Sequence, residues 1–140
     1  MRHHKYNKNF RFVVEPEQFN KYTDRELLQY CLGATMYMPG IKDFAPKILN
    51  ESIPGLTTMV LCFEDACPED RVEEAEQNVY HLLDTITDAI DKGTLSDDAI
   101  PLIFVRIRNL TQFKHFGNGL TKKQARALCG VNFPKFNAEN

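Results

Sequence analysis

Four short apolar runs, each closed by a polar or turn-forming residue, divide the chain into predicted strands. The runs cover residues 34–38, 57–63, 100–107 and 130–133. The second run is apolar almost throughout, and the third stays apolar up to Arg106, without the polar alternation of a half-exposed strand. Continuous apolar runs are typical of strands that are buried on both faces, as in a parallel sheet.

Between the second and third runs, apolar residues recur at spacings of three and four, which is typical of one face of a helix. They are Val72, Ala75, Val79, Leu82, Leu83, Ile86, Ala89 and Ile90. Pro68 suits the first turn of this helix, where a missing N–H costs nothing, and Gly93 suits its end. The pattern predicts a helix over residues 68–92 that lays one face against a sheet.

Two capping patterns predict two further helices. Thr23 and Glu26 form a capping box, in which each side chain satisfies a backbone N–H at the start of a helix, and Gly33 would end that helix. Thr121 and Gln124 repeat the pattern at the start of a last short helix.

The remaining segments complete an alternating order of strands and helices. A short helix is expected around residues 43–51, the polar and glycine-rich segment 109–119 predicts a loop, and residues 1–20 read as an extended arm. Alternation of strands and helices predicts an α/β fold with right-handed crossovers and a parallel sheet.

Charged residues stand where three of the predicted strands end. Glu64 and Asp65 follow the second strand, Arg106 closes the third, and Lys135 follows the fourth. In barrels of alternating strands and helices, active sites are built at the carboxyl ends of the strands. The pattern therefore favours a functional site at this edge of the sheet.

More ordinary roles remain open for the same residues. Arg106 could simply pair with Glu64 or Asp65, because structural ion pairs imitate sites. Asp65 could cap the helix that follows it, a role that is compatible with a place in the site. Lys135 could be a solvated loop lysine.

The composition argues against several classes of partner. The chain of 140 residues carries 17 Lys and Arg against 19 Asp and Glu, so its formal charge of -2 gives no electrostatic footprint for nucleic acid. No stretch approaches the roughly 20 apolar residues of a membrane helix. No apolar run of signal-peptide length follows the basic residues 1–5. We therefore expect a cytoplasmic protein with no nucleic-acid and no membrane partner.

The cysteines and histidines indicate neither disulfides nor a zinc site. No CxxC pair occurs among the four cysteines, which favours reduced and mostly buried thiols. They are Cys31, Cys62, Cys67 and Cys129. No two histidines have the spacing of zinc ligands.

Four motifs at the ends of the predicted strands carry a resemblance to a known family. They read Tyr37-Met38-Pro39-Gly40, Cys62-Phe63-Glu64-Asp65-Ala66-Cys67, Val105-Arg106-Ile107-Arg108-Asn109 and Gly130-Val131-Asn132-Phe133-Pro134-Lys135. In this order the motifs resemble the N-terminal half of the HpcH/HpaI aldolase and citrate lyase beta subunit superfamily. The chain looks closest to the carbon–carbon bond lyase branch found in tellurite-resistance-type stress gene clusters.

The resemblance implies a fold and an activity. The family fold is a parallel (β/α)8 TIM-type barrel, so residues 21–140 would be its N-terminal half, with the first four strands. Family members cleave or form a carbon–carbon bond in a carboxylate or acyl-thioester (CoA) substrate through an enolate stabilised by Mg²⁺. The two direct metal carboxylates come from later strands, beyond Asn140, so we expect the chain to be inactive alone and to form an oligomer or pair with a complementary C-terminal half.

The resemblance also implies roles for individual residues. Arg106 would clamp the substrate carboxylate or steady the enolate, which suits a guanidinium that is always charged and offers a bidentate fork. Glu64 and Asp65 would orient metal-bound water, with no direct metal ligand in this chain. Further substrate contacts would come from Tyr37, Pro39, Gly40, Asn109 and Lys135.

Two departures from the family pattern leave other readings open. Cys62 stands where the family has Asp, and Arg108 is an additional cation, so the site could accept a different anion, such as one that carries phosphate. The alternatives are a non-catalytic α/β anion-binding module that uses Arg106 and Arg108, a partner-dependent half-barrel subunit, or a purely structural protein. Whether this chain alone is an enzyme stays open.

Overall fold

A four-stranded parallel sheet forms the centre of the computed structural model, which describes residues 9–15 and 17–135. Its strands are β1 (Thr35–Pro39), β2 (Thr58–Cys62), β3 (Leu102–Arg106) and β4 (Leu128–Asn132). They lie in the order β1-β2-β3-β4, so each strand is parallel to the one before it in the chain. This is the strand order of one part of a parallel barrel. The predicted α/β class is therefore confirmed.

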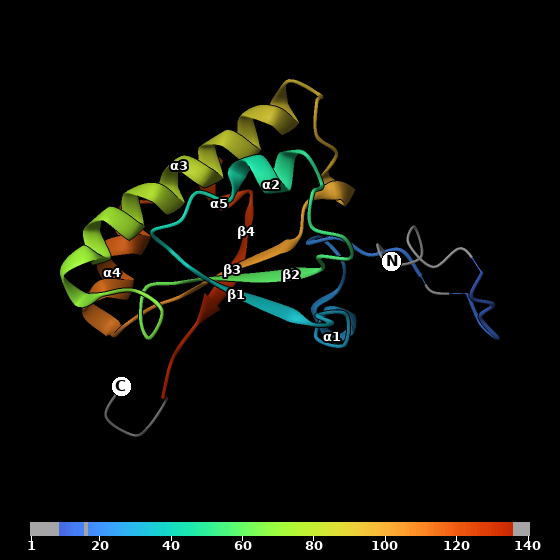
Figure 1. Cartoon of the computed structure of the whole chain (residues 1–140), viewed down its shortest axis with the longest axis horizontal. Helices are drawn as coiled ribbons and strands as arrows, with labels where there is room; N and C mark the ends of the chain where they lie inside the picture. The colour runs from blue at the N-terminus through green and yellow to red at the C-terminus, as the bar shows by residue number, and fades with distance from the viewer. Residues whose placement is uncertain (1–8, 16, 136–140) are drawn as a thin grey trace.

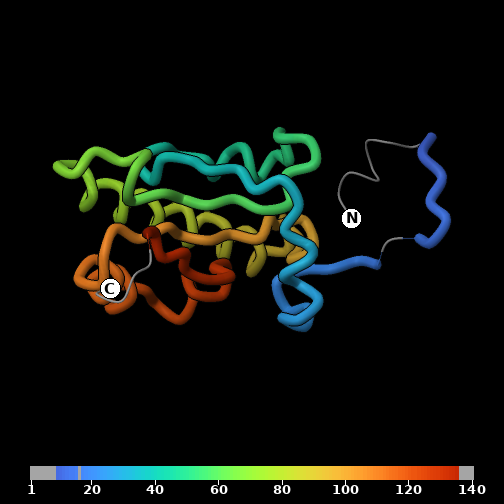
Figure 2. The backbone as a smooth tube through the Cα atoms, turned by 90° about the horizontal axis from the view of Figure 1, so that it is seen from below, coloured from blue at the N-terminus to red at the C-terminus, as the bar shows by residue number. Residues whose placement is uncertain are grey.

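Most of the helical structure lies on one face of this sheet (Figure 1). The chain forms α1 (Arg25–Leu28), α2 (Ala45–Leu49), α3 (Val72–Asp91), α4 (Leu110–Gly119) and α5 (Lys122–Ala125), and the short 3₁₀ turns η2 (Glu69–Arg71) and η3 (Asp97–Ala99). Figure 1 shows α2, α3 and α5 above the strands, α4 below the left end of α3, and α1 apart from them near the start of β1. Residues 9–15 lie outside the sheet and helix layers, on the side of α1 (Figure 2).

The core lies between α3 and the sheet. Alternate residues of β2 and β3 point toward the helices and are fully buried, among them Met59, Leu61, Ile103 and Val105. The predicted apolar stripe of α3 meets them, because Ala75, Val79, Leu82, Leu83 and Ile86 have no exposed surface. Gly93, at φ +69°, lies just beyond the end of α3, as predicted. The long helix therefore anchors the strands whose ends carry the charged residues.

The other face of the sheet is open and curved. Asn132 Nδ2 on β4 donates to the Tyr37 hydroxyl on β1 at 2.9 Å, although β2 and β3 lie between these strands. A hollow of about 490 Å³ on this face is lined by residues that include Val60, Phe104 and Val131. In a closed barrel the corresponding face is the packed interior. The sheet thus curves in the sense that a partial barrel requires.

The segment predicted as a loop over residues 109–119 is a helix instead, and that prediction was wrong. Asn109 Oδ1 accepts the N–H of Gln112 at 2.9 Å and caps the first turn of α4. Gln112 and Phe116, four residues apart, are both buried on one side of the helix. The polar and glycine-rich composition of residues 109–119 favoured a loop, although a capping side chain and one buried face stabilise a helix there.

The first capping box was also wrong, whereas the second is confirmed. Asp24 caps α1 by accepting the N–H of Glu26 at 2.9 Å, while the Thr23 hydroxyl accepts the N–H of Asn20 at 3.0 Å. At α5, Thr121 Oγ1 accepts from Gln124 N at 3.1 Å, and Gln124 Oε1 accepts from Thr121 N at 2.9 Å. Helix α1 ends at Leu28 rather than at Gly33.

The four cysteines are unpaired, as predicted: Cys62 and Cys67 are buried, and Cys31 and Cys129 are partly buried. Among the residues that the structure describes, no helix has both the length and the apolar character needed to cross a membrane.

Candidate functional site

The carboxyl ends of β2, β3 and β4 bring four charged residues to one edge of the sheet. Glu64 and Asp65 follow β2 directly, Arg106 is the last residue of β3, and Lys135 lies just after β4. The register places Cys62 of β2 beside Arg106 and Arg106 beside Asn132 of β4. Adjacent parallel strands that end in step therefore hold the four side chains within reach of one another.

These four residues form a compact ion cluster, which consists of Glu64, Asp65, Arg106 and Lys135. Arg106 Nη2 lies 2.5 Å from Glu64 Oε2 and 3.0 Å from Asp65 Oδ2. Lys135 Nζ lies 2.9 Å from Glu64 Oε1 and 3.3 Å from Asp65 Oδ1. Each carboxylate pairs with both cations, so the two negative and two positive charges balance.

The ion cluster has a buried half and an exposed half. The side chains of Glu64 and Arg106 are 9% and 19% exposed, whereas those of Asp65 and Lys135 are 59% and 71% exposed. Glu64 Oε2 is buried and is engaged by the ion pair with Arg106 Nη2, whereas the buried Arg106 Nε makes no hydrogen bond to the described residues. Buried polar atoms are nearly always hydrogen-bonded, so Arg106 Nε marks a place that suits a polar ligand.

Aromatic and amide side chains border the ion cluster on the open face. The Tyr37 ring lies with its centroid 5.9 Å from Arg106 Cζ, within the range of a cation–π contact. Its hydroxyl accepts the hydrogen bond from Asn132. The sequence did not single out Asn132, because the register that places it beside Arg106 follows an irregular pairing that a hydrophobic pattern does not reveal.

The cluster shifts the pKa of its exposed members. The hydrogen bond from Lys135 is the largest cause that lowers the pKa of Asp65, and Glu64 and Arg106 lower it further. The hydrogen bonds that Lys135 donates to Glu64 and Asp65 raise the pKa of Lys135 above its ordinary value. The site therefore favours the charged form of both groups.

The contribution of Asp65 to stability is expected to depend on pH. Because folding lowers the pKa of Asp65, its contribution is fully present above the ordinary value of 3.8 and is lost as pH falls through the lower folded pKa. Lys135→Met removes the largest cause, so the pKa of Asp65 should rise. Carboxyl ¹³C NMR titration measures it. Lys123→Met, which removes the partner of Asp88 instead, is the control and should leave Asp65 unchanged.

Two of the predicted substrate contacts, Pro39 and Gly40, lie at the end of β1, next to β2, which leads into Glu64 and Asp65. Pro39 pairs with Cys62 in the register, and the Gly40 N–H donates to the Cys62 carbonyl at 2.9 Å. Asn109 is the cap of α4 and lies after β3. The structure thus brings the four residues of the ion cluster and Tyr37 together. Gly40 instead makes a backbone hydrogen bond to β2, and Asn109 caps α4.

Gly40→Ala is expected to lower the free energy of unfolding by about 1–3 kcal/mol through overpacking. A Cβ at this position would lie 2.9 Å and 3.0 Å from ring carbons of Phe63 and 3.1 Å from the Cys62 carbonyl oxygen. Gly117→Ala is the matched control, because nothing lies within 4 Å of its Cβ. It should stabilise α4 by about 0.5–1 kcal/mol. Urea denaturation of both variants measures these changes in the free energy of unfolding. Equal changes for the two variants would contradict the close approach of Phe63 and Cys62 to Gly40.

Two alternatives for the site residues are settled by the geometry. The Arg106 ion pairs with Glu64 and Asp65 exist, as the structural alternative predicted, and they are compatible with substrate binding. The capping role of Asp65 was wrong, because the residue that precedes η2 is Pro68 and no side chain caps that turn. Arg108 directs its guanidinium to backbone carbonyl oxygens of the loop after β2.

The carboxylates of the ion cluster are already engaged by cations. Within residues 9–15 and 17–135, no three His, Cys, Asp or Glu side chains gather as potential metal ligands. Glu64 and Asp65 are the two carboxylates at the strand ends, and both are paired with cations. A hard divalent cation such as Mg²⁺ binds through oxygen ligands. The carboxylates of Glu64 and Asp65 could supply such oxygens, but here they already neutralise the charges of Arg106 and Lys135.

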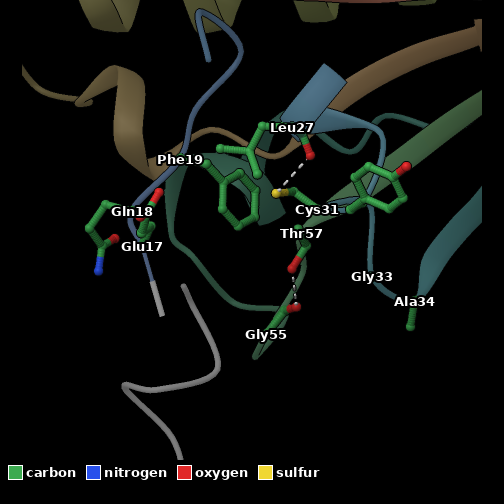
Figure 3. Close-up of a pocket in the computed structure, with 10 residues that line it drawn as sticks. Glu17, Gln18, Phe19, Leu27, Cys31, Gly33, Ala34, Gly55 and Thr57 are labelled. Carbon is green, nitrogen blue, oxygen red and sulfur yellow. Dashed lines mark hydrogen bonds between the residues drawn. The ribbon is translucent and has the colours of Figure 1, made fainter. Parts of the chain in front are cut away.

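A second, more apolar hollow of about 520 Å³ lies at the opposite ends of the strands. Figure 3 shows Phe19, Leu27 and Cys31 around it, with Gly33 and Thr57 just before β1 and β2. It is therefore separate from the ion cluster.

Comparison with known proteins identifies the family of the chain. No curated protein and no solved structure matches it. A family model described as C-C bond lyase of the TIM-barrel fold matches residues 26–140, which include all four strands and the whole ion cluster. The chain therefore belongs to this family of carbon–carbon bond lyases with the TIM-barrel fold.

Proposed function

We propose that this chain provides one wall of the active site of a carbon–carbon bond lyase that acts on a carboxylate or acyl-thioester substrate. The observation that carries the proposal is the ion cluster at the carboxyl edge of the sheet, in a chain of this family. Within the family, we place the chain in the citrate lyase beta-like and HpcH/HpaI aldolase group, in its stress-gene-cluster branch, and in the cytoplasm.

Arg106 has the central role in the proposed site. Cleavage of a carbon–carbon bond next to a carboxylate or thioester leaves negative charge on an enolate oxygen, and a fixed cation stabilises that charge. Arg106 Nε is a buried donor without a hydrogen bond to the described residues, so it can donate to a substrate oxygen while Nη2 stays with the carboxylates. Tyr37, Pro39, Gly40, Asn109 and Lys135 would complete the substrate contacts.

In this proposal the chain works with a complementary half. The open face beside Tyr37 and the free edges of β1 and β4 are surfaces that a closed barrel covers, and exposed strand edges favour association. The described residues lack a full set of Mg²⁺ ligands, so those ligands would come from the other half, and Glu64 and Asp65 would orient water from this side. The partner is a complementary C-terminal half or another copy in an oligomer.

Oxalate tests the role of Arg106, because it is a planar dianion that resembles a carboxylate enolate. Added to the isotope-labelled chain, it should shift the Arg106 Nε–H signal and the amides beside Tyr37. Arg106→Lys should abolish the response, whereas Arg126→Lys, at the exposed pair with Asp91, should retain it. Oxalate shifts that are absent, or that survive in Arg106→Lys, would refute this role.

The anion-binding module is the second candidate, favoured by the same Arg106 Nε, which has no hydrogen-bond acceptor within residues 9–15 and 17–135. A module should bind oxalate tightly on its own. The proposed lyase half should bind it weakly alone, and should gain affinity and Mg²⁺-dependent cleavage activity when a complementary half is added.

A further inference from the structure

Arg108 binds the loop that carries the acidic half of the ion cluster. Its Nε donates to the Phe63 carbonyl at 3.2 Å, and its Nη2 donates to the carbonyls of Cys67 at 2.8 Å and Glu64 at 3.4 Å. A backbone hydrogen bond of 2.8 Å from Cys67 N to Glu64 O closes the same turn. One planar cation thus bonds to three carbonyl oxygens on either side of Asp65.

Arg108 is in turn held from the helix layer. Its backbone N–H donates to Gln112 Oε1 at 3.1 Å, and Gln112 Nε2 donates to Glu76 Oε1 at 2.8 Å. Gln112 is 8% exposed and Glu76 is only 2% exposed. The other Glu76 oxygen lies 2.7 Å from Nδ1 of His115. The network therefore runs from α3 through α4 to the loop after β2.

A buried carboxylate is costly unless it is hydrogen-bonded, and a satisfied polar network fixes the positions of its members. Glu76 uses both of its oxygens inside the network, and Gln112 uses both ends of its amide. Neither residue belongs to the ion cluster. Their bonds hold the backbone from which the Arg108 side chain reaches the loop.

We propose that Arg108 is a positioning residue, which fixes the turn of residues 63–67 so that the Glu64 and Asp65 carboxylates meet Arg106 and Lys135. The inference deepens the proposed function, since it takes the ion cluster as the reacting site. Arg108 acts through carbonyl oxygens and not through contact with a substrate. A lysine at this position would keep the charge but lose the planar fork that serves three acceptors.

Arg108→Lys tests the proposal in the full chain. The pKa of Asp65 should move up toward its ordinary value, because a loosened turn no longer holds the Asp65 carboxylate beside Lys135. The amide of Cys67 should also exchange with solvent at least about tenfold faster. Arg71→Lys is the matched control, since Arg71 pairs with Glu74 on the same connection, and it should change neither. A folded Arg108→Lys protein with an unchanged Asp65 pKa would overturn the proposal, because a merely structural arginine would lower stability alone.

A measurement on the unsubstituted chain decides the matter if the variant does not fold. The Arg108 Nε–H should be as ordered as rigid backbone, with an order parameter of about 0.85, and a value below about 0.6 would overturn the proposal. Neither readout needs a substrate. Failure of oxalate to bind at Arg106 would therefore refute the proposed function and leave the role of Arg108 standing, and the reverse also holds.

Discussion

Phe63→Ala is expected to lower the free energy of unfolding by about 3–5 kcal/mol, the range for deleting a buried aromatic ring. Phe63 has no exposed surface, and its ring centroid lies 5.1 Å from that of Phe116 on α4. Its N–H donates to the Arg106 carbonyl at 2.9 Å, so the ring anchors the backbone that leads directly into Glu64. Alanine keeps these backbone bonds but leaves a cavity between the sheet and α4.

Urea denaturation measures this loss as a lower midpoint with an unchanged slope. Phe133→Ala is the control, because Phe133 is 40% exposed where it lies beside Phe113 of α4, and its truncation should cost less than about 1 kcal/mol. Similar losses for the two variants would contradict the assignment of Phe63 to the buried core and of Phe133 to a partly exposed position.

The sequence predicted the strands well where burial alone defines them. β2 and β3 each lie within two residues of the expected limits at both ends, because runs buried on both faces contrast sharply with the loops beside them. β4 was expected over residues 130–133 but covers Leu128–Asn132. Its first residue pairs with Ile103 before a register shift, and an irregular pairing of this kind leaves no mark in a hydrophobic pattern.

Helix α4 and the buried Glu76 escaped prediction for different reasons. Glu76 is satisfied by tertiary hydrogen bonds, which no local pattern reveals. Helix α4 did leave local signals, because Asn109 is a capping residue and the apolar residues Leu110, Phe113 and Phe116 recur at a spacing of three. The resemblance implies that Asn109 contacts substrate, whereas in the structure its side chain caps α4.

The candidate site was more predictable than its supports. Glu64, Asp65, Arg106 and Lys135 meet because parallel strands end at one edge, which follows from strand order alone. Arg108 was considered only as an additional cation for an anion site, yet it donates to main-chain carbonyls. Carbonyl acceptors occur at every residue, so a sequence cannot reveal which of them a side chain will reach.

Arg106→Met is expected to lower the free energy of unfolding by about 3 kcal/mol, because it removes a charged partner from a buried carboxylate. Glu64 is 9% exposed at its side chain, and without Arg106 it keeps only Lys135, whose own side chain is 71% exposed. Methionine preserves much of the length and the apolar stem of arginine, so the loss reports on charge. Urea denaturation near neutral pH measures it.

A double-mutant cycle with Glu64→Gln separates the ion pair from packing. Glutamine removes the carboxylate charge that Arg106→Met leaves buried without its partner. The double variant should therefore be more stable than Arg106→Met alone, with a coupling energy of about 1–3 kcal/mol between the two residues. Arg126→Met, at an exposed pair with Asp91, should cost less than about 1 kcal/mol. Additive effects at Arg106 and Glu64 would mean that the two charges are not held together, and Arg106 would then lack the fixed position that stabilising an enolate requires.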